Sequence, residues 1–248
     1  MKQIKKSRID QLVVDRGLTA SRTRAKALIM AGRVYVDGRV VDKAGSEVKI
    51  DSVITVTEDL PFVSRGGLKL AGALKEFSID VKGLTAVDIG SSTGGFTDCL
   101  LKSGVGHVYA IDVGKGLLDW TLRNDERVTV IEGQNIRHLP LDLIPVKADM
   151  AVIDVSFISL EKVLPRSKEL IKNGGTILAL IKPQFEVGKG EVGKGGIVKD
   201  PEKHRKVIER IKEFSIGIGL NAKAVTESPI KGAKGNIEFL IYLTCESG

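Results

Sequence analysis

From Leu84 to its end, the chain alternates between short apolar runs and amphipathic segments. Seven apolar runs have the length of strands: Thr85–Ile89, His107–Asp112, Val128–Ile131, Met150–Val155, Thr176–Ile181, Ala222–Thr226 and Phe239–Thr244. Segments with the apolar spacing of helices separate most of them, notably near residues 95–103, 159–172 and 201–216. This alternation predicts an α/β fold, a seven-stranded, mainly parallel sheet covered by helices on both faces. Because no helix separates the last two runs, we expect an antiparallel strand at one edge.

The first 60 residues follow a different pattern. Apolar residues at helical spacing predict two short helices, one around Ile9–Val13 and one capped by Ser21 and ended by Gly32. Asp37-Gly38 lies between two apolar-rich runs and predicts a hairpin. The sequence therefore predicts a small α+β domain over residues 1–60 and a larger α/β domain over residues 61–248.

Composition excludes several classes of protein. The 248 residues are 42% hydrophobic and 28% charged, which is typical of a globular protein. Two cysteines are too few for a disulfide framework, and they lack the clustering of a zinc site, so we expect no metal. The charged N-terminus precedes no apolar stretch, and no run approaches the roughly 20 residues that span a bilayer. We therefore expect a cytoplasmic protein without a membrane partner.

Charge is concentrated at the N-terminus. Residues 1–40 hold ten Lys and Arg against three Asp and Glu, whereas residues 41–248 hold 28 of each kind. Such an excess indicates a polyanionic partner or a solubilising tail. Here the basic residues are interleaved with a helical apolar pattern, which favours a nucleic acid. The candidate RNA-binding residues are Arg8, Arg22, Arg24, Lys26, Arg33 and Arg65.

This segment resembles the S4 RNA-binding module over roughly residues 3–56. The resemblance is carried by the stretch SRIDQLVVDRGLTASRTRAKALIMAGRVYVDGRVV, in which the order of elements, the turns and the basic helix face all agree. It implies that the N-terminal domain binds RNA.

A glycine-rich loop, residues 88–96, follows the first strand of the expected sheet. Ligands of open α/β sheets bind at the carboxyl ends of strands, where the strand order reverses. The glycine spacing does not match the G-x-G-x-x-G of dinucleotide-binding proteins, and a purely structural turn is the alternative. D-x-G-x-x-x-G-G-F resembles the S-adenosylmethionine loop of Rossmann-like methyltransferases. The candidate cofactor-binding residues are Asp88, Gly90, Ser91, Gly94, Gly95, Phe96, Asp112, Asn135 and Asp154.

Two further features concern the ligand. Asp112 ends the second strand, where a carboxylate can accept hydrogen bonds from ribose hydroxyls, although dehydrogenases also have an acid there. Residues 188–195, GKGEVGKG, almost form a P-loop, but Gly195 replaces the Ser or Thr that holds magnesium. We therefore interpret this second loop as a mobile basic lid.

Four charged residues form the candidate catalytic set. Asp154 and Lys182 each end an apolar strand at the edge where the glycine-rich loop lies, Lys69 opens a helix, and Glu238 begins the last strand. These residues are similar to the Lys-Asp-Lys-Glu tetrad of the RrmJ/FtsJ-like ribose 2′-O-methyltransferases. Together with the S4 module, the chain is identified as resembling the TlyA (hemolysin A) family. The motifs SRGGLKL, DIGSSTGGFTDCL, VIDVSFISL and IKPQFEVGK carry this resemblance.

The resemblance implies a class I methyltransferase fold, S-adenosylmethionine as cofactor, and ribosomal RNA or ribosomal subunits as partners. Our hypothesis makes Lys182 the base that removes the ribose 2′-hydroxyl proton, with Lys69 nearby to promote its deprotonation and steer the substrate. Asp154 would orient Lys182 and the methyl donor, and Glu238 would hold the lysine and the hydroxyl. A non-enzymatic RNA-binding scaffold is the main alternative. A pore-forming protein, a nicotinamide dehydrogenase and a base methyltransferase fit the motifs less well.

Overall fold

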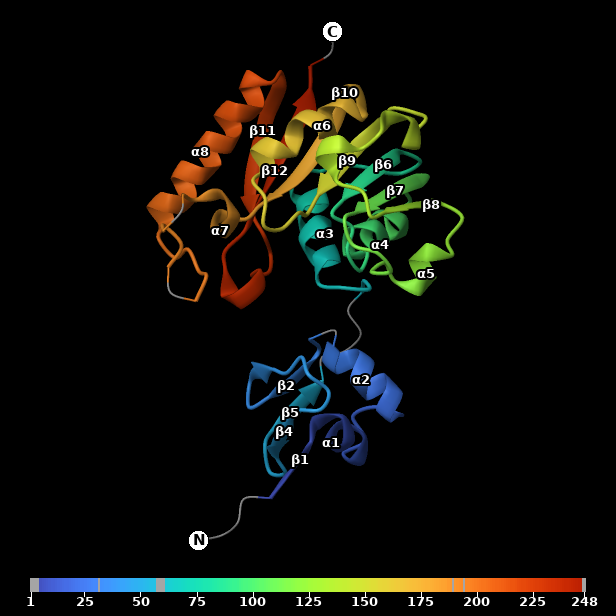
Figure 1. Cartoon of the computed structure of the whole chain (residues 1–248), viewed down its shortest axis with the longest axis vertical. Coiled ribbons are helices and arrows are strands. Elements are labelled where there is room, and N and C mark those ends of the chain that lie inside the picture. Colours follow the sequence, from blue (N-terminus) through green and yellow to red (C-terminus); the bar gives the residue numbers. More distant parts are fainter. Residues whose placement is uncertain (1–4, 31, 57–60, 189, 194, 247–248) are drawn as a thin grey trace. The chain divides into compact units, whose positions relative to one another are not determined.

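The computed structural model describes residues 5–30, 32–56, 61–188, 190–193 and 195–246. The chain divides into two compact units, residues 1–60 and residues 61–248 (Figure 1). Each unit has its own hydrophobic core, and they are described in turn.

The N-terminal unit combines two helices with short antiparallel strands. Its elements are β1 (Lys6–Arg8), α1 (Ile9–Asp15), α2 (Arg22–Met30), β2 (Val34–Val36), β3 (Arg39–Val40), β4 (Glu47–Lys49) and β5 (Ile54–Val56). The strands form a three-stranded sheet of order β3-β2-β5 and a separate β1-β4 pair. The Arg24 N–H donates to Ser21 Oγ at 3.2 Å, as expected of the predicted cap. Asp37 and Gly38 have φ values of 50° and 76°, which confirms the predicted hairpin turn.

The C-terminal unit is built on a seven-stranded sheet. Its strands are β6 (Thr85–Ile89), β7 (His107–Asp112), β8 (Val128–Glu132), β9 (Ala148–Ile153), β10 (Ile171–Ile181), β11 (Leu220–Glu227) and β12 (Phe239–Cys245). The order is β11-β12-β10-β9-β6-β7-β8, which confirms a mainly parallel, doubly wound sheet. The expected position of the antiparallel strand was wrong: β12 lies between β10 and β11 and is antiparallel to both. The edge strand is β11, because β12 is the strand that pairs with β10.

Helices and turns connect these strands. The helices are α3 (Gly66–Glu76), α4 (Gly95–Lys102), α5 (Trp120–Arg123), α6 (Leu164–Glu169), α7 (Pro183–Glu186) and α8 (Pro201–Gly217), and the 3₁₀ turns are η1 (Ile136–His138), η2 (Leu141–Leu143), η3 (Leu160–Lys162) and η4 (Ala233–Gly235). The helix expected over residues 159–172 is instead η3 followed by the short α6, and Ile171 already belongs to β10. Pro165 has no N–H to continue a helix from η3, but it fits the first turn of α6.

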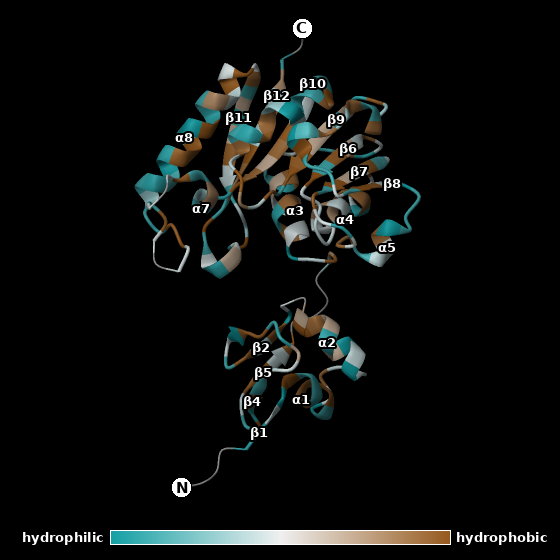
Figure 2. Cartoon of the chain, viewed as in Figure 1, coloured by the Kyte–Doolittle hydropathy of each residue, from teal (hydrophilic) through white to brown (hydrophobic). Residues whose placement is uncertain are grey.

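Alternate residues of each strand enter different cores, as a sheet buried on both faces requires. On β10, Ile177 and Ala179 pack in the cluster that contains residues of α6 and α8. Leu178 and Leu180 pack in the cluster that contains residues of α3 and α4. In Figure 2 the large sheet is mostly hydrophobic, and α8 carries both hydrophilic and hydrophobic residues. The sheet is therefore buried on both faces, and a ligand site is expected at the carboxyl ends of its strands.

Candidate functional site

The ends of four parallel strands meet at one edge of the sheet. Gly90 follows β6, Asp112 ends β7, Asp154 follows β9 and Lys182 follows β10. Ile89 is in register with both Ile111 and Ile153, which places these ends level with one another. The strand order reverses at β6, and such a reversal opens a crevice at the carboxyl edge.

A cavity of about 470 Å³ lies at this edge. Four of the predicted cofactor-binding residues line it, namely Gly90, Asp112, Asn135 and Asp154. Sequence reasoning missed the rest of the lining: Ile89, Ser92, Ile111, Val113, Leu117, Gln134, Ile136, Val155, Ser156, Phe157 and Ile158. Their common signal is position, because most of them lie within a few residues of the ends of β6, β7, β8 or β9.

Glycine is required at two positions of the loop after β6. Gly90 has a φ of +84°, and a Cβ there would lie 2.7 Å from the Asp154 carbonyl oxygen. Gly94 has a φ of +95° and precedes α4, and a Cβ there would lie 2.2 Å from Leu122 Cδ1. The loop is thus packed closely against the segment after β9 on one side and against α5 on the other.

Asp112 presents its carboxylate to the cavity in a fixed orientation. Its Oδ2 accepts a hydrogen bond from the Ser92 N–H at 2.8 Å, and its Oδ1 accepts one from the Gly114 N–H at 2.7 Å. Each carboxylate oxygen can accept a second hydrogen bond. Asn135 also lines the cavity, and its side-chain oxygen accepts from the Arg137 N–H at 3.1 Å. Both side chains are therefore held in place by backbone groups.

The remaining predicted cofactor-binding residues lie outside the cavity lining. Asp88 is fully buried, and its Oδ2 accepts a hydrogen bond from Thr97 Oγ1 at 2.7 Å. Burial, helped by the charges of Asp154 and Asp112, raises the pKa of Asp88 to about 7 against the opposing hydrogen bonds from Thr97. Ser91 and Phe96 are buried, and Gly94 and Gly95 form the start of α4. These residues support the loop without lining the cavity.

The four predicted catalytic residues form two ion pairs, in which Lys69, Lys182 and Glu238 are buried and Asp154 is partly exposed. Lys69 Nζ on α3 donates to Glu238 Oε2 at 2.6 Å, and Lys182 Nζ lies 2.6 Å from Asp154 Oδ1. The exposed fractions of the side chains are 11% and 2% for the first pair, and 10% and 21% for the second. The Lys182–Asp154 pair is therefore the one that reaches the cavity, through Asp154.

Two polar side chains that the sequence did not single out contact these pairs. Lys182 Nζ donates to Ser156 Oγ at 2.9 Å, and Gln184 Nε2 donates to Glu238 Oε1 at 3.4 Å. Beside them, Phe157 is 89% exposed and its ring centroid lies 4.9 Å from that of Phe185. The exposed ring of Phe157 thus lines the cavity and contacts Phe185, and Lys182 Nζ lies 5.9 Å from the centroid of the Phe185 ring.

In the N-terminal unit, two of the predicted RNA-binding residues form ion pairs with the buried Asp10. Arg8 and Arg22 each place a nitrogen 3.0 Å from Asp10 Oδ2, and both arginine side chains are 49% exposed. Arg24 and Lys26 lie on α2 with exposed side chains, and Arg33 is partly buried. Arg65 is exposed at the N-cap of α3, in the C-terminal unit.

Membrane-spanning helices and metal-binding clusters are both absent from the described residues. No helix among those residues is long and apolar enough to cross a bilayer. Nor do the described His, Cys, Asp and Glu residues gather into a group of three or more that could hold a metal ion. Lys189 and Lys194 of the expected lid lie outside the described residues, so the lid remains a prediction.

Known proteins resemble the chain over nearly its full length. The family model for FtsJ-like methyltransferases matches residues 62–245, and that for the S4 domain matches residues 7–54. The "16S/23S rRNA (cytidine-2'-O)-methyltransferase TlyA" of Mycobacterium tuberculosis is 42% identical over 245 residues, 98% of this chain and 91% of that protein. "Hemolysin A" of Brachyspira hyodysenteriae is 42% identical over 236 residues, 95% of this chain and 98% of that protein.

The structure of a hemolysin-named protein from Streptococcus thermophilus gives a TM-score of 0.77 at 42% identity, covering 99% of this chain and 90% of that one. Fold and site together define a Rossmann-like methyltransferase that uses S-adenosylmethionine. The chain belongs to the TlyA (hemolysin A) family, in which an S4 domain precedes an FtsJ-like methyltransferase domain.

The residues at the cavity fit this cofactor. Asp112 offers hydrogen-bond acceptors suited to ribose hydroxyls, and Asn135 offers a side-chain amide. The missing side chain at Gly90 lets the loop pack against the backbone of Asp154, and both residues line the cavity. The largely apolar walls of Ile89, Ile111, Leu117 and Ile136 suit a planar base.

Proposed function

We propose that this chain transfers a methyl group from S-adenosylmethionine to a ribose 2′-hydroxyl of ribosomal RNA. The observation that carries the proposal is the ion pair between Lys182 and Asp154, since Asp154 also lines the cofactor cavity. This ion pair supports a basic side chain next to the proposed site of the methyl donor. The substrate named for the relative from Mycobacterium tuberculosis supports the same reaction.

Gly90, Asp112, Asn135 and Asp154 would hold the cofactor, and Asp88, Ser91, Gly94, Gly95 and Phe96 would shape the loop that encloses it. When bound, the cofactor supplies an electrophilic methyl group on a sulfonium. A neutral hydroxyl is a poor nucleophile, so the chain must remove its proton as the new bond forms.

We assign the acceptance of that proton to Lys182, which can act as a base only as the neutral amine, after its ammonium has released a proton to solvent. Its ammonium has three N–H donors, and Asp154 and Ser156 engage it from two directions, which fixes its position. Lys69 and Glu238 form a second, more buried pair, and we assign to it the orientation of the ribose. Correct alignment of a hydroxyl behind a methyl group is worth up to ~7–11 kcal/mol in well-oriented systems, so this positioning matters as much as proton removal.

Binding of the RNA is assigned mainly to the N-terminal unit. Arg8, Arg22, Arg24, Lys26 and Arg33 would contact phosphates there, and Arg65 would do so near the start of α3. Phosphate contacts of this kind make affinity strongly dependent on salt. We infer ribosomal subunits as the form of the substrate and, with them, the cytoplasm as the location of the reaction.

The test is transfer of a tritiated methyl group from S-adenosylmethionine to separated ribosomal subunits from a strain that lacks this gene. We expect labelled RNA in which the linkage next to the methylated ribose resists alkali, and no label with Lys182→Ala. Binding of the cofactor without methyl transfer would contradict ribosomal RNA as the proposed substrate. Neither binding nor transfer would favour the alternative of a non-enzymatic RNA-binding scaffold.

A further inference from the structure

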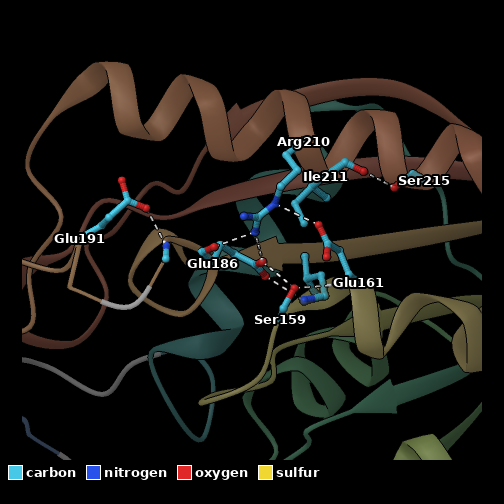
Figure 3. Close-up of polar contacts among 9 residues, drawn as sticks. Ser159, Glu161, Glu186, Glu191, Arg210, Ile211 and Ser215 are labelled. Carbon is cyan, nitrogen blue, oxygen red and sulfur yellow. Dashed lines mark hydrogen bonds and ion pairs between the residues drawn. The ribbon is translucent and has the colours of Figure 1, made fainter.

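Glu186, the last residue of α7, is a buried carboxylate that the proposed reaction does not use. Its side chain is 2% exposed. Oε2 accepts hydrogen bonds from Ser159 Oγ at 2.7 Å and from Arg210 Nη2 at 3.0 Å, and Oε1 accepts one from the Leu160 N–H at 2.8 Å. Figure 3 shows Ser159 and Arg210 converging on this carboxylate from different segments.

Arg210 of α8 extends the network in two directions. Its Nη2 also donates to the Glu186 carbonyl oxygen at 2.7 Å, and its Nε lies 2.9 Å from Glu161 Oε1. We refer to Ser159, Glu161, Glu186 and Arg210 as the Glu186 cluster (Figure 3). Both carboxylate oxygens of Glu186 accept hydrogen bonds. The cluster is therefore a buried hydrogen-bonded network and not an isolated ion pair on the surface.

Burial and neighbouring groups shift the pKa of Glu186 in opposite directions. Burial, together with the nearby charge of Glu161, raises the pKa of Glu186 above its ordinary value. Hydrogen bonds from Leu160 and Ser159 and the charge of Arg210 act in the opposite direction. A buried carboxylate is costly unless it is compensated in this way, and the compensation depends on all of these segments staying in place.

The cluster joins the two segments that carry the catalytic ion pair. Ser159 and Leu160 follow Asp154 on the segment after β9, and Glu186 follows Lys182 on the segment after β10. Among the described residues, two sets of polar contacts link these segments. One set joins Lys182 to Asp154 and Ser156, and the other joins Glu186 to Ser159 and Leu160. The ring contact between Phe157 and Phe185 lies between them along the chain.

We propose that Glu186 is a positioning residue, which holds the segments after β9 and β10 together so that Lys182 faces Asp154 and Ser156. A lysine side chain has four rotatable bonds and cannot fix its own position. The separation of Lys182 from Asp154 depends on the two backbones, and the Glu186 cluster joins these backbones just beyond the aromatic contact along each segment. The importance of this position rests on the proposed role of Lys182, but the geometric effect does not.

The proposal is tested first without RNA or cofactor, by competitive acetylation of the full-length chain with acetic anhydride. Mass spectrometry then gives the rate of modification at Lys182 relative to the exposed lysines. We compare Glu186→Gln, which removes the charge but keeps the shape, with Glu202→Gln. The second change removes a charge from the exposed Glu202–Arg205 pair of α8 and is a matched control.

We expect Lys182 to react several-fold faster in Glu186→Gln and at the wild-type rate in Glu202→Gln. The single-turnover rate of methyl transfer to ribosomal subunits, expressed per cofactor-bound enzyme, should fall ~10–30-fold in Glu186→Gln, because small misplacements of reacting groups slow reactions strongly. The affinity for RNA should not change. Normalisation to bound enzyme removes any effect of a smaller folded fraction.

An unchanged acetylation rate at Lys182 in folded Glu186→Gln would overturn the proposal and leave the cluster with a stabilising role alone. If Glu186→Gln does not fold, Ser159→Ala decides instead; it removes the hydrogen bond from Ser159 Oγ to Glu186 together with the one that Ser159 Oγ accepts from the Glu161 N–H. It should show the same changes at about a third of their size, and wild-type behaviour would overturn the proposal. If the wild-type chain does not methylate subunits, the proposed function fails, while acetylation still decides whether Glu186 positions Lys182.

Discussion

Lys69 Nζ and Glu238 Oε2 lie 2.6 Å apart, although 169 positions separate the two residues in the sequence. Lys69 belongs to α3, which precedes the sheet, and Glu238 precedes β12, the last strand. The contact therefore forms only when β12 has inserted between β10 and β11. The first and last elements of the methyltransferase unit therefore meet here, so the four predicted catalytic residues come together only in the folded unit.

Removal of Lys182 should separate methyl transfer from cofactor binding. Because Lys182 does not line the cavity, Lys182→Ala should leave the affinity for S-adenosylmethionine nearly unchanged. Loss of the proposed proton acceptor should slow single-turnover transfer ~10²–10⁴-fold. Rapid-quench kinetics and calorimetry measure the two effects. Lys162→Ala, an exposed lysine of η3, is the control, and a near-normal rate in Lys182→Ala would exclude its role as the base.

Gly90→Ala should weaken cofactor binding, and a second variant separates the effect of the steric contact from that of the backbone strain. The new Cβ combines an unfavourable positive φ with a contact of 2.7 Å to the Asp154 carbonyl oxygen. Gly83 has a φ of +73° and no atom within 4 Å of a Cβ, so Gly83→Ala introduces comparable strain without the contact. Calorimetry should show at least a ~10-fold loss of affinity in Gly90→Ala alone. Equal losses in both variants would make strain, not contact, the cause.

Asp112→Asn should weaken binding of S-adenosylhomocysteine by ~10–100-fold, as expected for loss of a charged acceptor. The amide NH₂ group would also face one of the N–H donors, from Ser92 or Gly114, that now hold the carboxylate. Asp80→Asn changes an exposed acid and should bind normally. Unchanged affinity in Asp112→Asn would show that the carboxylate does not hold the cofactor.

The pKa of Asp88, which burial raises to about 7 from an ordinary 3.8, predicts a pH dependence of stability. Between these values the folded state binds more protons than the unfolded state, so this group lowers the free energy of unfolding as pH rises from about 4 to 7. Asp88→Asn removes that contribution. Its thermal midpoint should therefore rise relative to wild type across this range and stay level above it. A difference that is constant with pH would contradict the assignment.

Arg22 and Lys26 should behave differently although both lie on α2. Arg22→Ala removes a partner of the buried Asp10, whose pKa Arg8 and Arg22 hold at about 2. This change should cost ~1–3 kcal/mol of stability and also reduce RNA affinity. Lys26→Ala should leave stability unchanged and lower the salt dependence of binding by about one phosphate contact. Equal melting temperatures for the two variants would contradict this distinction.

Several elements of the fold could be predicted from the sequence because neighbouring residues determine them. The bounds of β6 and β7, the cap at Ser21 and the turn at Asp37-Gly38 follow from apolar spacing and turn chemistry within a few residues. Local signals also failed in places. Apolar spacing predicted one helix over residues 159–172, where the structure has η3 followed by α6, with Pro165 in the first turn of α6. The position of β12 within the sheet depends on long-range pairing, which no local pattern encodes.

The candidate site, like the fold, could be predicted from the sequence only in part. Charged residues after apolar strands marked Asp112, Asp154 and Lys182, because the carboxyl ends of parallel strands must meet at one edge. The sequence thus determined which chemical groups gather there. Tertiary packing alone decided that Lys182 pairs with Asp154 and Lys69 with Glu238, which candidates line the cavity, and that Glu186 is buried against Ser159 and Arg210. Side-chain pairing depends on distances between segments far apart in the chain, and only the folded structure sets those distances.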